Sequence, residues 1–542
     1  MTPHLLVVTI GPVQDFIAAA RRTRDLWFGS HLLSEISKAA ARVIAEDGGK
    51  LIFPALEKND PRLVPSDDID AFNVANIILA ELPDGSDPVD LRGRAYEAAQ
   101  SRWRDYARGA RNEAKVFVRG DIWDEQVDDV IAFYSAWIPL GDDYAASRKR
   151  LMHILSGRKA TRDFLPAKGR PRIRKSSLDG ARESVLDKSE VPWKLVLKMR
   201  LAEGEQLCAV GLTKRLGGDI ATFPSVIRVA ADPWIRGVKA SGGDAERHLQ
   251  EIIDLCEGVN GFSSGTDKLV YRDFPYDGQV LYPSRLHRLM NPNRGSDAYE
   301  DLLSNTDRDK LKDIKDRVDR LQKNENGGLA LGTPDPYLAL LVADGDRIGK
   351  VISAIKSAKK SAKKHREFSA KLAEFAGQAR SIIEGHNGCL VYSGGDDVLA
   401  FLPVDICLKA ARKLHDKFGE LLKDYPAGVA GAPTLSVGIA IGHFMEPLED
   451  LLAWARDAEK ASKDPDRNGL AIHFHARAGG DPIQLRDRWQ DAGGMDQRIE
   501  RWAGLHLNNE IPDKAAYDIR QLAEDYKGWG WVEKDGSVLL YV

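Results

Sequence analysis

The stretch CLVYSGGDDVLAFLPV, residues 389–404, places two glycines and two adjacent acids between two apolar runs. Apolar runs joined by a glycine-containing turn predict a β-hairpin, with strands over 389–393 and 398–403. A turn needs at most one acid, and two neighbouring carboxylates repel each other. Asp396 and Asp397 are therefore either solvated turn residues or ligands that a cation holds together.

The segments around this hairpin alternate in the order of a ferredoxin-like sheet. The predicted order is strand, helix, hairpin, helix, strand, helix and strand, over 337–343, 363–384, 389–403, 405–423, 434–442, 447–463 and 470–476. In a β-α-β-β-α-β fold the first strand and the hairpin strands are neighbours in one sheet. Asp344 and Asp346, at the end of the first strand, are then expected beside Asp396 and Asp397.

A second copy of the same opening stands near the N-terminus. LLVVTIGPVQDFI aligns there with LLVADGDRIGKVI, which begins at Leu340, and each reads as a strand, a turn and a helix start. Thr9 stands where the later copy has Asp344, and Gly11 stands where it has Asp346. The sequence therefore predicts two related sheets, of which only the second carries acids at the strand end.

Three or four converging carboxylates need cations to offset their repulsion. Mg²⁺ suits such a site because it is commonly held by a few carboxylates together with substrate phosphates. Two such ions can activate a 3′-hydroxyl and stabilise a leaving pyrophosphate during attack at a nucleotide α-phosphate. Lys460 and Lys463 precede the segment RNGLAI. Each is either a residue that reaches triphosphate oxygens or part of a solvated helix face.

The rest of the chain is less regular. The sequence predicts strands at 4–10 and within KLIFPAL and NVANIILAEL, and a helix over 13–47 with a break near Gly29 and Ser30. A helical stretch is expected over about 88–144, an irregular segment over 176–294, a solvated helix over 296–328 and a Trp-rich helical segment over 481–542.

Composition bounds the class of protein. The net charge of −3 gives no overall attraction for nucleic acid, so any RNA contact needs a local basic patch. The segments 157–175 and 356–368 are the strongest such patches, each either a phosphate-binding arm or a solvated linker, and the RNA-binding residues stay unassigned. The four cysteines form no C-x-x-C pair, and no run approaches the roughly 20 apolar residues of a membrane span, which indicates a cytoplasmic protein.

Two motifs carry a resemblance to a known family. TIGPVQDFIAAARRTRDLWFGSHLLSEIS near the N-terminus and YSGGDDVLAFLP in the later sheet resemble the large catalytic subunit of type III-B CRISPR effector complexes, the Cmr complex. The likeness covers most of the chain in order. The second sheet is also similar to diguanylate cyclase domains, whose strand-end acids and AK…GRN segment correspond to Asp344, Asp346, Lys463, Arg467 and Asn468.

The resemblance implies an α+β fold class with two ferredoxin-like palm domains, a mixed intervening domain and a helical C-terminal domain. The corresponding segments are a degenerate first palm over 1–160, an intervening domain with a degenerate zinc-site region over 161–325, a catalytic palm over 326–480 and a helical domain over 481–542. It also implies that the protein joins ATP molecules 3′–5′ into cyclic oligoadenylates when its complex, guided by CRISPR RNA, binds target RNA.

The family's functional residues transfer by position. Asp344, Asp396 and Asp397 would hold Mg²⁺ or Mn²⁺ and carry catalysis, and Asp346 would support the metals at the same site. The expected nucleotide-binding residues are Gly345, Ser393, Gly394, Gly395, Lys460 and Lys463, with the glycines letting ATP approach the backbone and Ser393 near the base.

The sequence departs from the family pattern twice. Many members begin with an HD nuclease domain, but the strand at 4–10 leaves no room for one, and His415 and Asp416 are expected on a solvated helix face. We therefore expect no DNase activity. LCAVGLTKR keeps Cys208 but has Gly211 where a second zinc cysteine would stand, so zinc is not expected.

Other functions remain open at this point. The same acids would serve a palm that joins AMP to S-adenosylmethionine. A catalytically silent subunit that organises guide and target RNA is a third hypothesis, which the intact acid set disfavours. A free-standing diguanylate cyclase is a fourth, which the long N-terminal half and the second palm-like copy disfavour.

Overall fold

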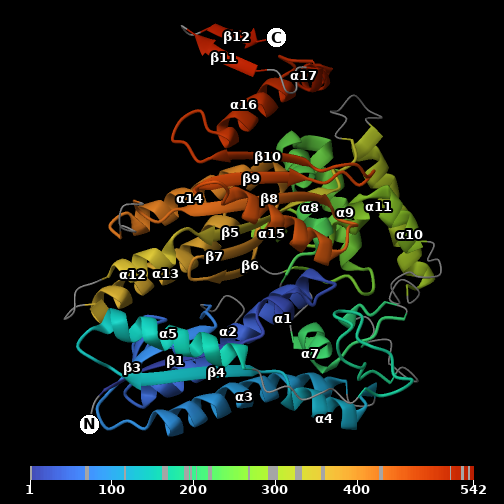
Figure 1. Cartoon of the computed structure of the whole chain (residues 1–542). Helices are drawn as coiled ribbons and strands as arrows, with labels where there is room; N and C mark the ends of the chain where they lie inside the picture. The colour runs from blue at the N-terminus through green and yellow to red at the C-terminus, as the bar shows by residue number, and fades with distance from the viewer. Residues whose placement is uncertain are drawn as a thin grey trace. The chain divides into compact units, whose positions relative to one another are not determined.

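The computed structural model of the chain is shown in Figure 1. It describes residues 3–66, 73–114, 117–161, 169–187, 195, 198–202, 204–217, 223–265, 269–290, 303–323, 332–355, 361–425, 431–512, 514–525, 530–534 and 537–541. Two compact units are present, residues 1–486 and residues 487–542. Within the described ranges no helix is both long enough and apolar enough to cross a membrane.

The first sheet has four antiparallel strands in the order β2-β3-β1-β4. They are β1 His4–Gly11, β2 Lys50–Phe53, β3 Ile77–Leu82 and β4 Ala132–Pro139. Alternate side chains of β1 enter two different cores, which explains its unbroken apolar run. One core holds Leu6 with the buried residues of α2 (Thr23–Glu46) and α3 (Pro88–Glu113), and the other holds Leu5 with those of α5 (Tyr144–Ala160).

The second sheet has six strands in the order β10-β9-β8-β5-β7-β6. They are β5 Tyr337–Gly345, β6 Cys389–Gly394, β7 Asp397–Leu402, β8 Leu435–His443, β9 Gly469–Phe474 and β10 Ile483–Arg488. Helices α13 (Ser361–Glu384), α14 (Cys407–Leu422) and α15 (Leu448–Ser462) connect them. In both sheets the first strand lies between the third and the fourth, so the predicted pair of ferredoxin-like sheets is confirmed.

Shorter elements complete the two units. The first unit also contains α1 Gln14–Ala18, α4 Gly120–Asp128, α7 Ala209–Gly217, α8 Val226–Ser241, α9 Gly243–Glu257, α10 Pro283–Met290, α11 Asn305–Lys323 and α12 Ile348–Ala354. Its 3₁₀ turns are Pro61–Leu63, Leu269–Tyr271, Gly278–Leu281 and Val404–Ile406. The second unit contains α16 Met495–Leu507, α17 Lys514–Asp525 and a hairpin of β11 Gly530–Lys534 and β12 Ser537–Tyr541.

Four local predictions are wrong. The segment 176–294, expected to be irregular, contains the helices α7, α8, α9 and α10. The N-terminal helix runs through Gly29 and the break falls before Thr23 instead, because Gly29 makes room for Lys214 rather than ending a helix. The expected helical stretch 88–144 contains β4, whose aromatic AFYSAWIP segment has the composition of a strand. The C-terminal segment is helical only in part, since it ends in the hairpin of β11 and β12.

The two basic segments are partly visible. The start of 157–175 belongs to α5, and Arg170 within it is paired with Asp121 and with Glu125 at 2.7 Å. Residues 162–168 and 356–360 lie outside the described residues, and 361–368 form the first turns of α13. Neither segment is thereby assigned a ligand.

A buried ion-pair cluster fixes α2 against α7. The Arg215 guanidinium donates to both Asp25 oxygens, at 2.6 and 2.8 Å, and to Glu205 at 2.9 Å. Arg215 and Asp25 have no exposed side-chain surface. Burial alone would raise the pKa of Asp25, but the charge and hydrogen bonds of Arg215 hold it below its ordinary value. The neighbouring Lys214 donates to the carbonyl oxygens of Phe16 and Ala19, so it also anchors the chain before α2.

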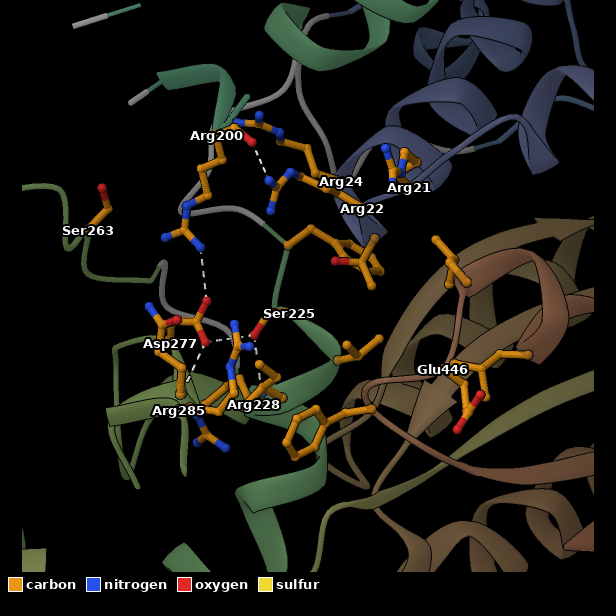
Figure 2. A pocket seen from close by; sticks show the side chains of 18 of the residues that line it. Arg21, Arg22, Arg24, Arg200, Ser225, Arg228, Ser263, Asp277, Arg285 and Glu446 are labelled. Atoms are coloured by element: carbon orange, nitrogen blue, oxygen red, sulfur yellow. Dashed lines mark hydrogen bonds and ion pairs between the residues drawn. The ribbon is translucent and has the colours of Figure 1, made fainter. Parts of the chain in front are cut away.

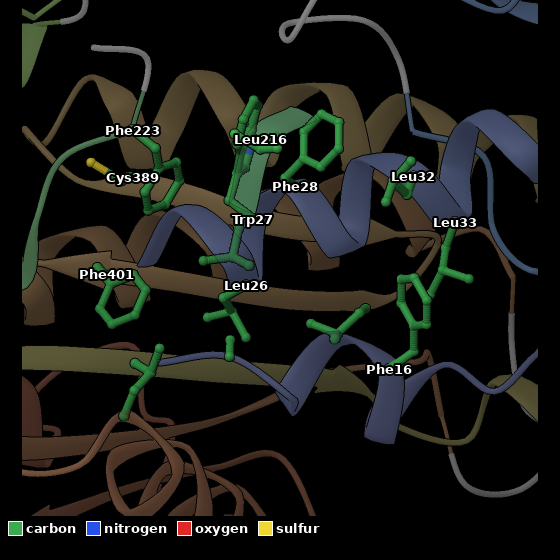
Figure 3. Close-up of a cluster of buried hydrophobic side chains, with 14 of the residues drawn as sticks. Phe16, Leu26, Trp27, Phe28, Leu32, Leu33, Leu216, Phe223, Cys389 and Phe401 are labelled. Carbon is green, nitrogen blue, oxygen red and sulfur yellow. The ribbon is translucent and has the colours of Figure 1, made fainter. Parts of the chain in front are cut away.

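An aromatic row connects α2 to the second sheet (Figure 3). Trp27 on α2 stacks on Phe223 at a centroid distance of 5.8 Å. Phe223 meets Phe401 on β7 edge-on at 6.4 Å. All three side chains belong to one buried cluster that spans both sheets. The hairpin strands therefore pack against a helix of the first sheet.

A second contact joins the sheets through α5 and α13. Tyr144 Oη and His365 Nδ1 share a buried hydrogen bond of 2.6 Å. Burial, followed by the charge of Arg148, lowers the pKa of His365 to about 3. His365 is therefore neutral in the folded protein at physiological pH. Close by, Arg366 donates to the Leu51 carbonyl oxygen at 2.8 Å.

Removing Asp25 should test the buried cluster. Asp25→Ala is expected to destabilise the protein by about 3 kcal/mol or more, because it leaves much of the Arg215 charge buried and unpaired. The measurement is thermal unfolding of the purified chain. Asp90→Ala is the matched control, because Asp90 pairs with Arg94 on the surface. It should change Tm little, since exposed ion pairs contribute little to stability. Equal, small shifts in both variants would contradict the assigned role.

The His365 contact predicts a specific acid sensitivity. The unfolded chain binds a proton at His365 below about pH 6.5, whereas the folded chain does not, so stability is retained above pH 6.5 and lost as pH falls. His365→Gln removes this proton uptake. Between pH 7 and pH 5 the wild-type Tm is therefore expected to fall more than that of the variant. Parallel Tm–pH curves would show that His365 is not buried as a neutral group.

Candidate active site

The strand register brings predicted acids to one edge of the second sheet. Ala343 on β5 pairs with Val398 on β7, so Asp344 follows directly beside the hairpin turn. Gly394 pairs with Asp397 and closes that turn. The expected proximity of Asp344 to the Gly-Gly-Asp-Asp tip is therefore confirmed.

Three carboxyl groups crowd together at this edge. Burial, followed by the charge of Asp344, raises the pKa of Asp396 to about 7. The pKa of Asp397 is raised as well, by burial of its carboxyl group, by a hydrogen bond with Asp344 and by the charge of Asp396. Taken over all its atoms, Asp397 is an exposed residue. Coupled groups of this kind titrate as a cluster. The cluster therefore favours a bound cation or proton.

Lys463 brings a positive charge to the cluster. It follows the end of α15, and its Nζ donates to Asp344 Oδ2 at 2.5 Å. The same ammonium group is paired with Glu459. A cation is thus already held against the acids in this structure, which shows that the carboxylates attract positive charge.

Asp346 is bonded into the sheet rather than into the cluster. Its Oδ2 accepts hydrogen bonds from Thr434 Oγ1, Ser436 Oγ and the Asn468 N–H, at 2.8, 2.7 and 2.9 Å. The residue is fully buried, and its Oδ1 faces Arg467 at 3.4 Å. An oxygen with three donors has little capacity left for a metal. The bonding of Oδ2 fits the supporting role expected for Asp346, and its place at the metal site stays a prediction.

The glycines of the site allow close approach. Gly395 has a φ of +75°, which glycine adopts readily at the first position of a two-residue hairpin turn. A Cβ on Gly345 would lie 2.6 Å from the Asp396 Cβ, so Gly345 lets β5 and the turn pack together. Beside them, the Ser393 hydroxyl is buried without a hydrogen-bond partner in the described structure. A hydroxyl in that state can accept or donate to a ligand.

A basic cavity opens next to the acids. Its volume is about 850 Å³, and Gly345, Asp396, Arg347, Lys350 and Arg467 are among the residues that line it. The two residues Arg347 and Lys350 were not singled out from the sequence, although they follow the strand-end acids in DGDRIGK. Their position beside the cluster suits the phosphates of a nucleotide.

Two further residues change the expected site. Lys460 is exposed on α15, and no hydrogen bond or ion pair joins it to the aspartates within the described chain, so Lys463 alone of the two lysines reaches the acids. Phe53, at the end of β2 in the first sheet, borders the hairpin turn, since a Cβ on Gly395 would lie 3.6 Å from its ring. The sequence carried no signal for Phe53, because the contact joins two separate sheets.

The donor set is compatible with a divalent metal that arrives with its substrate. The described residues contain no group of three or more His, Cys, Asp or Glu side chains already arranged around a metal position. Mg²⁺ usually keeps several waters and is held by one or two carboxylates plus substrate phosphates, so a preformed protein cage is not required. Asp344, Asp396 and Asp397 beside a basic cavity supply those carboxylates and that phosphate site.

Two family models match the chain. Residues 5–108 match the model described as CRISPR-associated protein Cmr2, N-terminal, and residues 337–471 match Cas10/Cmr2, second palm domain. A curated relative, the CRISPR system Cmr subunit Cmr2 of Pyrococcus furiosus, is 27% identical over 575 residues. The alignment covers 89% of this chain and 62% of the relative, so the chain spans less than two thirds of that protein's length.

Solved structures share the fold. The type III-B Cmr-beta complex in its apo state contains a chain that matches with a TM-score of 0.64 and 14% identity, over 97% of this chain and 76% of that one. The same type of complex bound to cognate target RNA matches with a TM-score of 0.59, 14% identity and the same coverage. The chain is therefore similar in sequence to a Cmr2 subunit, it matches the Cas10/Cmr2 second palm domain over residues 337–471, and it shares the fold of a chain in the type III-B Cmr-beta complex.

Proposed function

We propose that this chain is a metal-dependent nucleotidyltransferase that joins ATP molecules 3′–5′ into cyclic oligoadenylates. The observation that carries the proposal is the convergence of Asp344, Asp396 and Asp397 at one sheet edge beside a basic cavity. Carboxylates that converge without a cation repel one another, so the gathering of these three at one edge points to cation-dependent chemistry.

The metals are the first requirement of this function. We assign Asp344, Asp396 and Asp397 to hold Mg²⁺ or Mn²⁺, with Asp346 in support. Bound there, two such ions supply activation of a 3′-hydroxyl and charge stabilisation at the α-phosphate and the leaving pyrophosphate. Lys463 offsets part of the negative charge before nucleotide arrives and is placed to contact phosphate oxygens afterwards.

The remaining residues position the nucleotide. Arg347, Lys350 and Arg467 line the cavity beside Asp396 and are suited to bind the triphosphate. Of the two turn glycines, Gly395 is the one suited to let a nucleotide approach the backbone, because the Tyr392 side chain covers the Cα of Gly394. The Ser393 hydroxyl is buried beside this turn without a hydrogen-bond partner among the described residues.

The protein's partners follow from its relatives. We infer that the chain works in a Cmr-type complex with other subunits, a CRISPR guide RNA and target RNA, and that target RNA switches its activity on. The curated relative is a Cmr subunit, and one structural neighbour is a Cmr-beta complex bound to cognate target RNA. The four free cysteines are buried and suit a reducing compartment, so we place the protein in the cytoplasm.

One product assay tests the function against its alternatives. The complex is mixed with Mg²⁺ or Mn²⁺, target RNA and labelled ATP, with and without S-adenosylmethionine, and the products are identified by mass. Cyclic oligoadenylates are expected, and Asp396→Ala with Asp397→Ala should lower their formation at least 100-fold because the metals lose two ligands. An AMP adduct of S-adenosylmethionine would support the second hypothesis, and no product would support the silent scaffold. Product that survives the double substitution in an intact complex contradicts the assigned site.

A second prediction separates metal ligands from the supporting acid. Asp346→Asn keeps an oxygen for Thr434 and Ser436, so Mn²⁺ affinity in the presence of a non-hydrolysable ATP analogue should change by about threefold or less. Asp396→Asn should weaken Mn²⁺ binding at least tenfold, because it removes a charged ligand. Electron paramagnetic resonance of free Mn²⁺ measures both. Equal losses would show that Asp346 ligates the metal directly.

A further inference from the structure

A second cavity, of about 200 Å³, lies away from the aspartates (Figure 2). It is enclosed by the N-terminal end of α2, the start of α8 and the turn from β8 to α15. Gly345, at the acid end of β5, pairs with Leu435, whereas Tyr337 pairs with His443. Phe444, which lines the cavity, follows His443. The cavity is therefore at the opposite end of the second sheet from the acids, and the proposed catalysis does not account for it.

Positive charge exceeds negative charge around this cavity. The residues that line it include six arginines and two acids: Arg21, Arg22, Arg24, Arg200, Arg228 and Arg285, with Asp277 and Glu446. Asp277 is engaged by Arg200 at 3.0 Å, and Arg228 is paired with Asp232 at 3.2 Å. Figure 2 shows Glu446 on the other side of the cavity from Arg200 and Asp277. The lining therefore keeps a surplus of guanidinium groups.

The contacts of two arginines indicate that the cavity lacks an anion. Arg24 is buried and donates to the neutral carbonyl oxygens of Lys198 and Met199, at 3.1 and 3.3 Å. Arg285 has a buried Nε without a hydrogen-bond partner in the part of the chain described, and its Nη1 lies 3.9 Å from the Met445 sulfur. A buried, unbonded N–H on a charged group is costly. The described residues thus leave the Arg285 guanidinium without its full set of acceptors.

The opposite wall is apolar and leads into a larger space. Phe223, Phe444, Leu448 and Leu451 supply this wall. An adjoining cavity of about 750 Å³ shares Arg285 and Phe444 and adds Arg477. Phe444 is buried, and its ring packs against those of Tyr282 and His443, so the arginines are the groups that this space offers to a phosphate.

We propose that this cavity binds a nucleotide phosphate through the surplus arginines of its lining, among them Arg21 and Arg285. Arginine suits this position because its planar fork binds phosphate oxygens in pairs. The phosphate comes from a single-stranded RNA segment or from a free nucleotide. The inference stands apart from the proposed catalytic function, because none of the three aspartates lines this cavity.

Binding measurements on the full chain test this site. A fluorescein-labelled 12-nucleotide single-stranded RNA is titrated by anisotropy, and ATP and ADP by calorimetry, all in EDTA so that metal-dependent binding at the aspartates is suppressed. The test variant is Arg21→Gln with Arg285→Gln. The control is Arg62→Gln with Arg104→Gln, which removes the same charge from exposed arginines paired with Asp60 and Asp128.

The test variant should bind its ligand at least tenfold more weakly than the control, and the slope of log K against log salt should fall by about 2. Weaker binding of RNA alone assigns the phosphate to a strand, and weaker binding of ATP and ADP assigns it to a free nucleotide. If the glutamine variant unfolds, Arg21→Lys with Arg285→Lys replaces it and should show intermediate affinity, because lysine keeps the charge but loses the fork. Affinities that match the control for every probe overturn the proposal.

Discussion

The position of α2 depends on the buried pair of Arg215 and Asp25. Both side chains are fully removed from solvent, and Glu205 completes the charge balance. Because an unpaired charge there is costly, the pair fixes α2 against α7. Through Trp27 and Phe223, α2 then supports Phe401 on the hairpin strand β7. The edge that carries the acids is thus held by a contact with the first sheet.

At that edge, by contrast, the charges are not balanced by partners. Asp344, Asp396 and Asp397 are held together without enough positive charge to balance them, and Lys463 offsets only part of the repulsion. A fold tolerates such a cluster when its surroundings are rigid. Here Asp346, bonded to Thr434, fixes the end of β5. The result is an excess of negative charge at this edge, on which the proposed metal binding depends.

The arginine-lined cavity has an excess of positive charge, opposite in sign to that of the aspartates. The RRTRD segment supplies Asp25 to the buried pair and also Arg21 and Arg24 to the cavity. One short motif therefore serves both the packing of the two sheets and an excess of positive charge at the far end of the second sheet. This double use explains why so many arginines stand together in a chain whose net charge is −3.

The sequence by itself determined strands β1 to β3, the second sheet from β5 to β9, its hairpin and the meeting of Asp344 with the Gly-Gly-Asp-Asp turn, because strand order follows from the alternation of apolar runs and helices. It did not reveal β4, the course of α2 through Gly29, or the separate position of Asp346. Only the tertiary structure decided these, along with the Phe53 contact and the arginine cavity. Each depends on side chains distant in sequence, and local patterns carry no record of which distant partner satisfies a buried charge or fills the space beside a glycine.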